Sequence, residues 1–387
     1  EMGIPGLPVP EVALDAERAA LAAGVASSYP PVAGIPRLKE EISRFISLFL
    51  DVHVDPAGCV PTTGSINGSY AAFMVGGRAR KERDSVLFID PGFPVHKQQA
   101  KMVGLEPRTF DVYDYRGGAL EERLERALSD GRVSALLYSN PNNPSWICFT
   151  EEELKTIARV AEKHDVIVIE DLAYFAMDFR WDLGRPGEPP FQPSVAKFTD
   201  SYILLVSSSK AFSYAGQRIG MLCVSDALME RRFPDLLHYY NNDQFGEALI
   251  LGTLYATTAG VTHSAQHGLA ALLTAVNNGE YDFLSVVRRY GDRAKLMKRA
   301  FTDNGFQIVY DTDIDQPIAD GFYFTVSYPG MTGEELIQEL LYYGVSAISL
   351  GQTGSERTEG IRACVSLVHE DQIPELRRRI ELFAAQQ

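Results

Sequence analysis

The sequence contains few cysteines, and their spacing excludes a disulfide framework or a zinc cluster. Its 387 residues include four cysteines that lie far apart, with no Cys-x-x-Cys pair and no histidine at ligand spacing. These are Cys59, Cys148, Cys223 and Cys364. We therefore expect free, buried thiols in a reducing cytoplasm and no bound metal.

Long apolar runs and clusters of positive charge are also missing. Apolar stretches such as Tyr202–Val206 have the length of a strand, whereas a membrane-spanning helix needs roughly 20 residues. The formal net charge is -15, and no run of Lys and Arg offsets it, which argues against a nucleic acid partner. The chain also shows no basic and apolar leader and no lipidation signal. We expect a soluble, cytoplasmic protein with neither membrane nor nucleic acid as a partner.

The residues that are present favour a large α/β protein. Hydrophobic residues make up 45% of the chain and charged residues 22%, so it can bury a large core and should divide into two domains. From residue 85 to residue 225, short apolar runs alternate with amphipathic stretches, which predicts a mostly parallel sheet covered by helices on both faces. The expected strands are Ser85–Asp90, Ala135–Asn140, Val166–Asp171, Tyr202–Ser209 and Gly220–Ser225. Thr150 and Glu153 form a capping box that begins a crossover helix between two of these strands.

After about residue 248 the sequence becomes helical and then mixed. The long amphipathic stretch Tyr281–Phe301 suits a helix that connects two domains. The remaining residues predict a compact α+β unit. Its expected elements are a strand at Gly321–Tyr328, a helix at Gly333–Tyr343, strands at Val345–Leu350 and Gly360–Leu367, and a last helix at Glu370–Ala385.

Polar residues follow several of the predicted strands, which is where open α/β sheets bind their ligands. Lys210 comes after three serines, and Arg218 follows it by eight residues. An amine forms an imine with an aldehyde, and a guanidinium holds a phosphate through two hydrogen bonds. The pair suits a phosphorylated aldehyde, although a lysine after a strand is more often a solvated surface residue.

Two other features support this interpretation, and each also has an ordinary structural explanation. Gly64 and Ser65 precede a helix whose first N–H groups can seat a phosphate, but the same residues would serve as a plain helix start. The segment contains only Gly64 and Gly68 and so fails the G-x-G-x-x-G pattern of a dinucleotide site, which disfavours a nicotinamide cofactor. Asp171 ends an apolar strand, where a buried carboxylate needs a cation such as a protonated pyridine, unless it caps a helix or forms a salt bridge.

The order of several motifs carries a resemblance to a known family. Ser207–Gly220 reads Ser-Ser-Ser-Lys-Ala-Phe-Ser-Tyr-Ala-Gly-Gln-Arg-Ile-Gly, which is similar to the signature S-x-S-K-x-x-x-x-x-G-x-R-x-G. Asp171–Tyr174 resembles D-x-x-Y, and Asn140–Pro144 resembles N-P-x-N-P. These motifs, in this order, resemble the class I/II aminotransferases of the aspartate aminotransferase superfamily, which have pyridoxal 5′-phosphate (PLP) fold type I.

The resemblance implies that PLP is the cofactor and that Lys210 carries it as a Schiff base. It implies that Asp171 pairs with the pyridine nitrogen, that Tyr174 and Asn143 contact the ring oxygen, and that Phe93 stacks on the ring. Lys210, Asp171 and Tyr174 are the expected catalytic residues. The residues expected around the phosphate are Gly64, Ser65, Ile66, Ser207 and Arg218.

The two ends of the chain carry further family-like segments. Gly3 lies in a segment that resembles the G-x-P substrate loop, and Arg362 lies in one that resembles the strand whose arginine clamps the substrate carboxylate. With Asn143, these are the expected substrate-binding residues. Tyr29 resembles the tyrosine that reaches the phosphate of the neighbouring subunit, which implies a homodimer with shared active sites. The implied fold is α/β, with a large PLP-binding domain at residues 38–268 around a seven-stranded type of mostly parallel sheet, and a smaller α+β domain from residues 1–37 and 269–387.

The function that follows from the resemblance is transfer of the amino group of an L-amino acid to a 2-oxo acid. A PLP-dependent β-lyase or synthase would use the same motifs, so this alternative stays open. A non-catalytic PLP-binding sensor domain is a weaker alternative, because the resemblance begins at Gly3 and leaves no room for a preceding DNA-binding module.

One residue departs from the family pattern. Trp146 occupies the place of a usual glycine in N-P-[ST]-G. We therefore expect the loop conformation there, and the substrate pocket beside it, to differ from the family pattern. Trp146, Phe93 and the pair Tyr239 and Tyr240 suggest an apolar or aromatic pocket, although tyrosines in a helix are more often ordinary packing.

Overall fold

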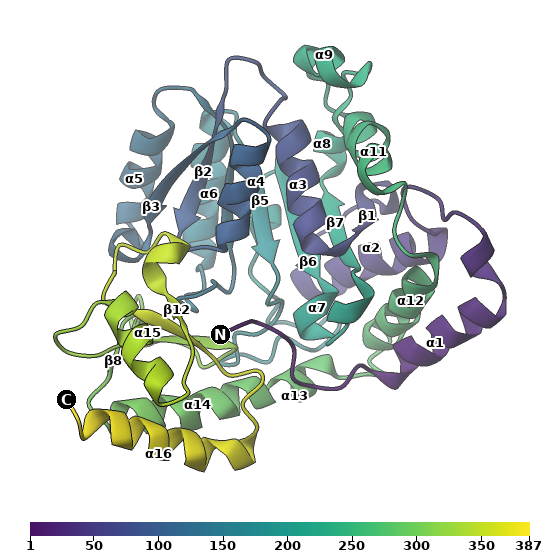
Figure 1. Cartoon of the computed structure of the whole chain (residues 1–387). Coiled ribbons are helices and arrows are strands. Elements are labelled where there is room, and N and C mark those ends of the chain that lie inside the picture. Colours follow the sequence, from purple (N-terminus) through teal and green to yellow (C-terminus); the bar gives the residue numbers. More distant parts are fainter.

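The computed structural model describes residues 1–387, and a seven-stranded sheet lies at its centre (Figure 1). The strand order is β1-β7-β6-β5-β4-β2-β3. β7 runs antiparallel to both of its neighbours, and all other neighbouring pairs are parallel. The strands are β1 Cys59–Thr62, β2 Ser85–Asp90, β3 Glu106–Asp111, β4 Val133–Ser139, β5 Ile167–Leu172, β6 Tyr202–Ser207 and β7 Gly220–Val224. The predicted α/β class and the mostly parallel sheet are confirmed.

Helices cover both faces of this sheet, and the alternation of side chains along each strand separates two hydrophobic clusters. In β2, Val86 and Phe88 pack in one cluster with helix α3 (Gly64–Gly76), whereas Leu87 and Ile89 pack in the other. The second cluster also contains buried faces of other helices. These are α2 Pro36–Leu50, α5 Ala119–Leu128, α6 Glu151–Lys163 and α12 His263–Asn277. The capping box of Thr150 and Glu153 begins α6, as predicted.

A second, antiparallel sheet forms near both ends of the chain (Figure 1). Its order is β12-β13-β11-β8. The strands are β8 Gln307–Ile308, β11 Tyr323–Ser327, β12 Ile348–Ser349 and β13 Ile361–Cys364, and a separate pair consists of β9 Thr312–Asp313 and β10 Gln316–Pro317. The helices beside it are α14 Arg289–Thr302, α15 Gly333–Tyr342 and α16 Ile373–Ala384.

The first residues of the chain lie in two places. Helix α1 (Glu11–Ala22) packs against α12, where Glu17 accepts hydrogen bonds from Tyr214 at 2.6 Å and from Ser264 at 3.1 Å. The residues before α1 cross to the second sheet instead, where the backbone N–H of Gly6 donates to the hydroxyl of Tyr290. The division into residues 38–268 and the two end segments stays a prediction.

The remaining helices are short. They are α4 Pro94–Met102, α7 Ser208–Ala211, α8 Asp226–Glu230, α9 Leu237–Tyr240, α10 Phe245–Glu247, a π-helix at Ala248–Leu254, α11 Tyr255–Thr258 and α13 Phe283–Val287. None of the helices is long and apolar enough to cross a membrane.

Several predicted boundaries were wrong. The strand expected to reach Ser209 ends at Ser207, because the Ser207 side chain accepts the N–H of Ser209 and caps α7. The single helix expected at residues 281–301 is divided into α13 and α14. The strand expected at residues 345–350 is only the two residues of β12.

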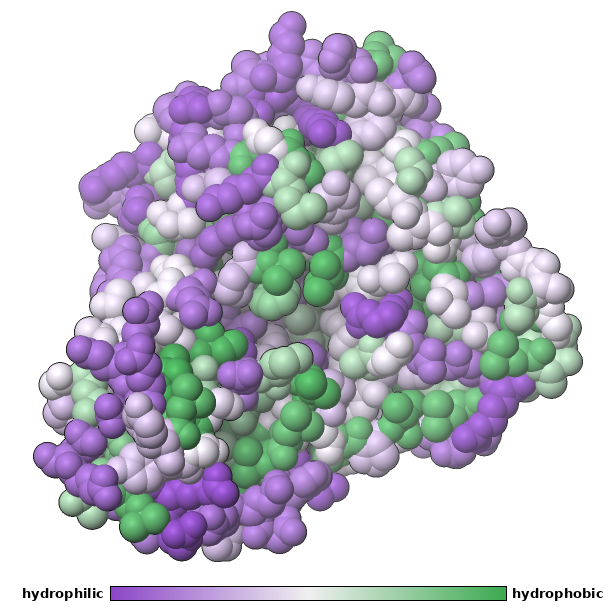
Figure 2. All heavy atoms as spheres, in the orientation of Figure 1, coloured by the Kyte–Doolittle hydropathy of each residue, from purple (hydrophilic) through white to green (hydrophobic).

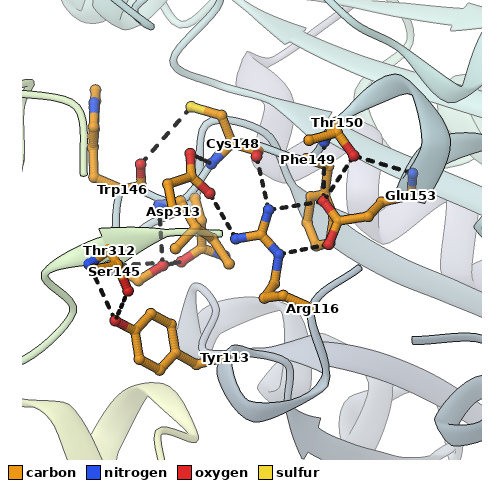
Figure 3. A network of polar contacts seen from close by, with 12 residues as sticks. Tyr113, Arg116, Ser145, Trp146, Cys148, Phe149, Thr150, Glu153, Thr312 and Asp313 are labelled. Atoms are coloured by element: carbon orange, nitrogen blue, oxygen red, sulfur yellow. Dashed lines mark hydrogen bonds and ion pairs between the residues drawn. The ribbon is translucent and has the colours of Figure 1, made fainter. Parts of the chain in front are cut away.

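A buried ionic network joins the β9–β10 pair to the large sheet and its helices (Figure 3). Asp313 forms ion pairs of 2.7 Å with both Arg116 and Arg180, and it accepts the backbone N–H of Cys148 at 3.1 Å. Arg116 also pairs with Glu153 of α6 at 2.7 Å. Because Asp313 and Arg116 are almost fully buried, each charge depends on its partners.

We therefore predict that replacing Asp313 with alanine destabilises the protein strongly. The substitution leaves two guanidinium groups without their shared carboxylate, which should lower the free energy of unfolding by about 3–5 kcal/mol. Urea unfolding of the cofactor-free chain measures this loss. The neighbouring Asp315→Ala is the control, because Asp315 is exposed in the same loop and should change little. Equal effects of the two substitutions would contradict the role of Asp313.

Candidate active site

A cavity of about 370 Å³ lies beyond the carboxyl ends of the parallel strands, between the two sheets. Figure 2 shows hydrophobic side chains gathered around a hollow near the centre of this face. Most residues predicted from the sequence line the cavity. They are Gly3, Ser65, Ile66, Phe93, Asn143, Asp171, Tyr174, Ser207, Lys210, Arg218 and Arg362. Tyr29 does not line it and is 89% exposed.

Lys210 lines this cavity and belongs to the short helix α7, which follows β6 directly. Its amine donates a hydrogen bond to the carbonyl of Gly3. Burial lowers the pKa of Lys210 to about 8, and the positive charges of Arg218 and Arg362 act in the same direction. A larger fraction of this amine is therefore neutral and nucleophilic near pH 7 than for an ordinary lysine.

Arg218 lies against the start of helix α3. A Cβ on Gly64 would come within 2.5 Å of Arg218 Nη2, and a Cβ on Gly220 would come within 2.8 Å of the N–H of Ser65. The left-handed backbone at Gly64, with φ of +72°, also favours glycine. The two glycines thus bring a guanidinium, the hydroxyl of Ser65 and the N-terminal end of a helix together, which is a suitable arrangement for a phosphate.

Asp171 is buried at the end of β5 without a positive partner at hydrogen-bond distance. Its carboxylate accepts the N–H of Ala173 at 3.1 Å, and His96 Nε2 lies 4.0 Å away. Burial lowers the pKa of His96 to about 4, so the imidazole is neutral at pH 7, and burial raises the pKa of Asp171 to about 7. A protonated pyridine beside Asp171 would supply the missing charge, so the site fits the cofactor in this respect.

The sequence reasoning missed His96. It stands three residues after Phe93 on helix α4, so the two side chains lie one turn apart and their rings meet edge to face at 5.4 Å. The spacing of three residues between Phe93 and His96 was the feature of the sequence that could have revealed His96.

Tyr323 was also missed, and it connects two residues that were predicted. Its hydroxyl accepts a hydrogen bond from Tyr174 at 2.9 Å, and its ring lies 4.2 Å from the guanidinium of Arg362. Arg362 Nη1 donates to Asn143 at 2.9 Å and Nη2 donates to the carbonyl of Glu1 at 2.6 Å, whereas Nε is buried without a partner. An arginine with an unused buried N–H suits an incoming carboxylate.

Trp146 lies behind the cavity and does not line it, which corrects the expectation that it shapes the pocket directly. The indole is fully buried, and its ring centroid lies 5.2 Å from that of Tyr174. Its backbone has φ of +65°, a conformation that the usual glycine would adopt more easily. Gly321 makes the space, because a Cβ there would overlap the indole.

The tyrosine pair suggested for the pocket is also elsewhere. Tyr239 and Tyr240 lie on α9, and Tyr240 donates to the carbonyl of Met74 on α3. Neither side chain lines the cavity. Tyr240 is half-buried, and Tyr239 is 47% exposed.

Trp146 and Gly321 should behave as a matched pair. Gly321→Ala alone should cost about 1–3 kcal/mol through overpacking, and Trp146→Gly alone should cost about 3–5 kcal/mol through the lost indole. In Trp146→Gly/Gly321→Ala the added methyl group no longer meets the indole, so the double variant should unfold at a smaller cost than the two single costs together. Urea unfolding of all four proteins tests this, and additive costs would show that the two sites are independent.

Comparisons with known proteins agree with this geometry. A probable aspartate/prephenate aminotransferase of Thermus aquaticus is 28% identical over 59% of this chain and 56% of its own length. An S-alkyl-thiohydroximate lyase of Arabidopsis thaliana is 28% identical over 53% of this chain and 43% of its own length. The chain thus spans little more than half of the first relative.

The structural comparison covers more of the chain. The fold superposes on a double mutant of Thermus thermophilus aspartate aminotransferase with a TM-score of 0.79 at 22% identity, over 100% of this chain and 90% of the other. The family model for aminotransferase class I and II matches residues 3–380. The chain therefore belongs to the class I and II aminotransferase family, as its motifs indicated.

Proposed function

We propose that the protein is a PLP-dependent aminotransferase that moves the amino group of an L-amino acid to a 2-oxo acid. One observation carries the proposal. A lysine with a lowered pKa shares a cavity with a phosphate-binding arrangement, a buried carboxylate that lacks a cation and an arginine with a free N–H. Each of these features matches a different part of the cofactor or the substrate.

The residues divide into those that hold the cofactor and those that move the proton. PLP is the cofactor of this family, and when bound it supplies an aldehyde and an electron-withdrawing ring. Lys210 would carry the aldehyde, Arg218 with Ser65, Ile66, Gly64 and Ser207 would hold the phosphate, and Asp171 would keep the ring nitrogen protonated. Phe93 would cover one face of the ring, while Tyr174 and Asn143 would contact its oxygen.

Substrate binding would use the other end of the cavity. The guanidinium of Arg362 would bind the α-carboxylate, and Asn143 already accepts a hydrogen bond from its Nη1 at 2.9 Å. The carbonyl of Gly3 accepts a hydrogen bond from Lys210. The amino group of the substrate would displace Lys210 from the aldehyde. The freed amine of Lys210 would then accept the proton of the α-C–H bond and return it during transfer. A neutral amine is needed for that step, and the lowered pKa of Lys210 raises the neutral fraction.

A β-lyase acting on the same scaffold is the second candidate. It is favoured by one finding, the similarity to a lyase of Arabidopsis thaliana that is as strong in identity as the similarity to the aminotransferase. Lys210, Asp171 and Arg362 would have the same roles in both reactions, so the substrate's leaving group decides between them.

We also infer that the protein is a cytoplasmic homodimer. Tyr29 is exposed and cannot serve the cavity of its own chain, so we assign it to the phosphate of the partner's site. Exposed apolar side chains on the same side of the fold, such as Leu21, support a covered surface there.

The amino-transfer proposal predicts two results for the enzyme loaded with PLP. Borohydride reduction should fix the cofactor to Lys210, and Lys210→Ala should abolish both this attachment and turnover. Incubation with amino acids alone should convert the cofactor to its pyridoxamine form with release of a 2-oxo acid. Release of ammonia and pyruvate, with the cofactor unchanged, would instead identify a lyase.

The buried carboxyl predicts a pH dependence of stability. Because the pKa of Asp171 is raised in the folded, cofactor-free chain, its contribution to stability is present at low pH and is lost as the pH rises through about 7. Asp171→Asn removes this contribution, so the variant should gain relative to the wild type between pH 5 and pH 8. Melting temperatures of both cofactor-free proteins at the two pH values measure the gain, and parallel pH profiles would contradict it.

A further inference from the structure

Every charged group of the active-site cavity already has a use in the proposed function. The charged residues that line it are Asp171, Lys210, Arg218 and Arg362. Asp171 would bind the ring nitrogen of the cofactor, and Lys210 its aldehyde. Arg218 would bind the phosphate, and Arg362 the α-carboxylate of the substrate. His96 also lines the cavity, but it is neutral and faces Asp171. No cation is left for a second carboxylate on the substrate.

The groups beside Arg362 are apolar. Ile348 of β12 pairs directly with Arg362 of β13 in the antiparallel register, so the two side chains point to the same face, about 5 Å apart. Ile348 is half-buried and lines the cavity. A substrate whose carboxylate binds Arg362 therefore presents its side chain close to Ile348.

Other apolar side chains of the cavity continue this surface. Met2 and Ile4 of the first segment and Ile66 of α3 line the cavity, and all three are at least 40% exposed. An apolar ligand that covers these three side chains would bind favourably, because the contact removes their exposed apolar surface from water. A carboxylate at the same place would lose its water without gaining a partner.

The hollow that contains Tyr29 offers no lysine or arginine of its own. This hollow is lined by residues 21 and 25–30 together with residues 258–264. These residues include no Lys or Arg, and His263 is their one ionisable nitrogen base. If this surface faces the partner's cavity, it adds further apolar and hydroxyl groups.

We propose that the amino donor carries an uncharged, apolar side chain, of the kind found in leucine and methionine, and that aspartate and glutamate are poor donors. This rests on the proposed amino-transfer function and specifies its substrate class. Ile348, Ile66 and Ile4 form the specificity-determining surface.

The test compares single donors with the PLP-loaded enzyme. Conversion of the cofactor to its pyridoxamine form should proceed at least about 10-fold faster, per unit of donor concentration, with leucine and methionine than with aspartate and glutamate. Ile348→Arg adds a guanidinium beside Arg362 and should narrow or reverse this ratio. Leu341→Arg is the matched control, because Leu341 is 55% exposed on α15 and away from the cavity, so the ratio should stay that of the wild type.

A binding measurement separates the possible failures. Calorimetric titration of the loaded enzyme should show tighter binding of 4-methylpentanoate than of maleate, two carboxylates that cannot react. Faster conversion with aspartate, or tighter binding of maleate, would overturn the substrate class and leave amino transfer intact. If no amino acid converts the cofactor, amino transfer fails, and the titration still decides whether the pocket is apolar.

Discussion

The carboxylate of Asp171 is buried at the end of a central strand with one backbone donor and no positive neighbour. A charge in such a place is costly unless a ligand brings the opposite charge. The surrounding fold makes the cost unavoidable, because β4 and β6 flank β5 and every residue of the three strands is buried. Binding of a protonated ring would provide the positive charge that this carboxylate lacks.

The second sheet completes this site, and two packing arrangements hold it there. Asp313 binds two arginines of the large sheet's helices and loops, beside the segment that carries Asn143. Gly321 receives the indole of Trp146 from the same segment. Both contacts lie within one stretch of chain, just before β11 and its cavity residue Tyr323. The position of Arg362 relative to Lys210 thus depends on buried contacts that lie outside the cavity.

The sequence predicted residues that are close together along the chain better than those that meet only in space. Lys210 and Arg218 belong to one continuous motif, so the resemblance of a single segment to the family signature was enough to predict them. Ile348 and Tyr323 reach the site only through the antiparallel register of the second sheet, which the sequence did not specify. The strand boundaries there were wrong for the same reason, since β12 has two residues and is held by its neighbours.

Two strands of the large sheet were not predicted, and their residues explain why. β1 contains Pro61, which cannot donate to a sheet and is normally confined to edge strands. β3 is largely unburied along Glu106–Thr109 and so lacks the apolar run of the central strands. Both lie at the edges of the sheet. Neither missed strand obscured the site, since its catalytic groups follow the fully buried strands.

The departure at Trp146 shows how the fold accommodates a bulky residue in the family pattern. A bulky residue replaces a glycine in a left-handed position, and the strain is offset by burial of a complete indole against Tyr174 and Tyr323. Because Tyr174 and Tyr323 also hydrogen-bond to each other, the indole packs against a joined pair of tyrosines, of which Tyr323 contacts Arg362. The indole N–H has no partner, so Trp146 contributes by packing behind the two tyrosines that line the cavity.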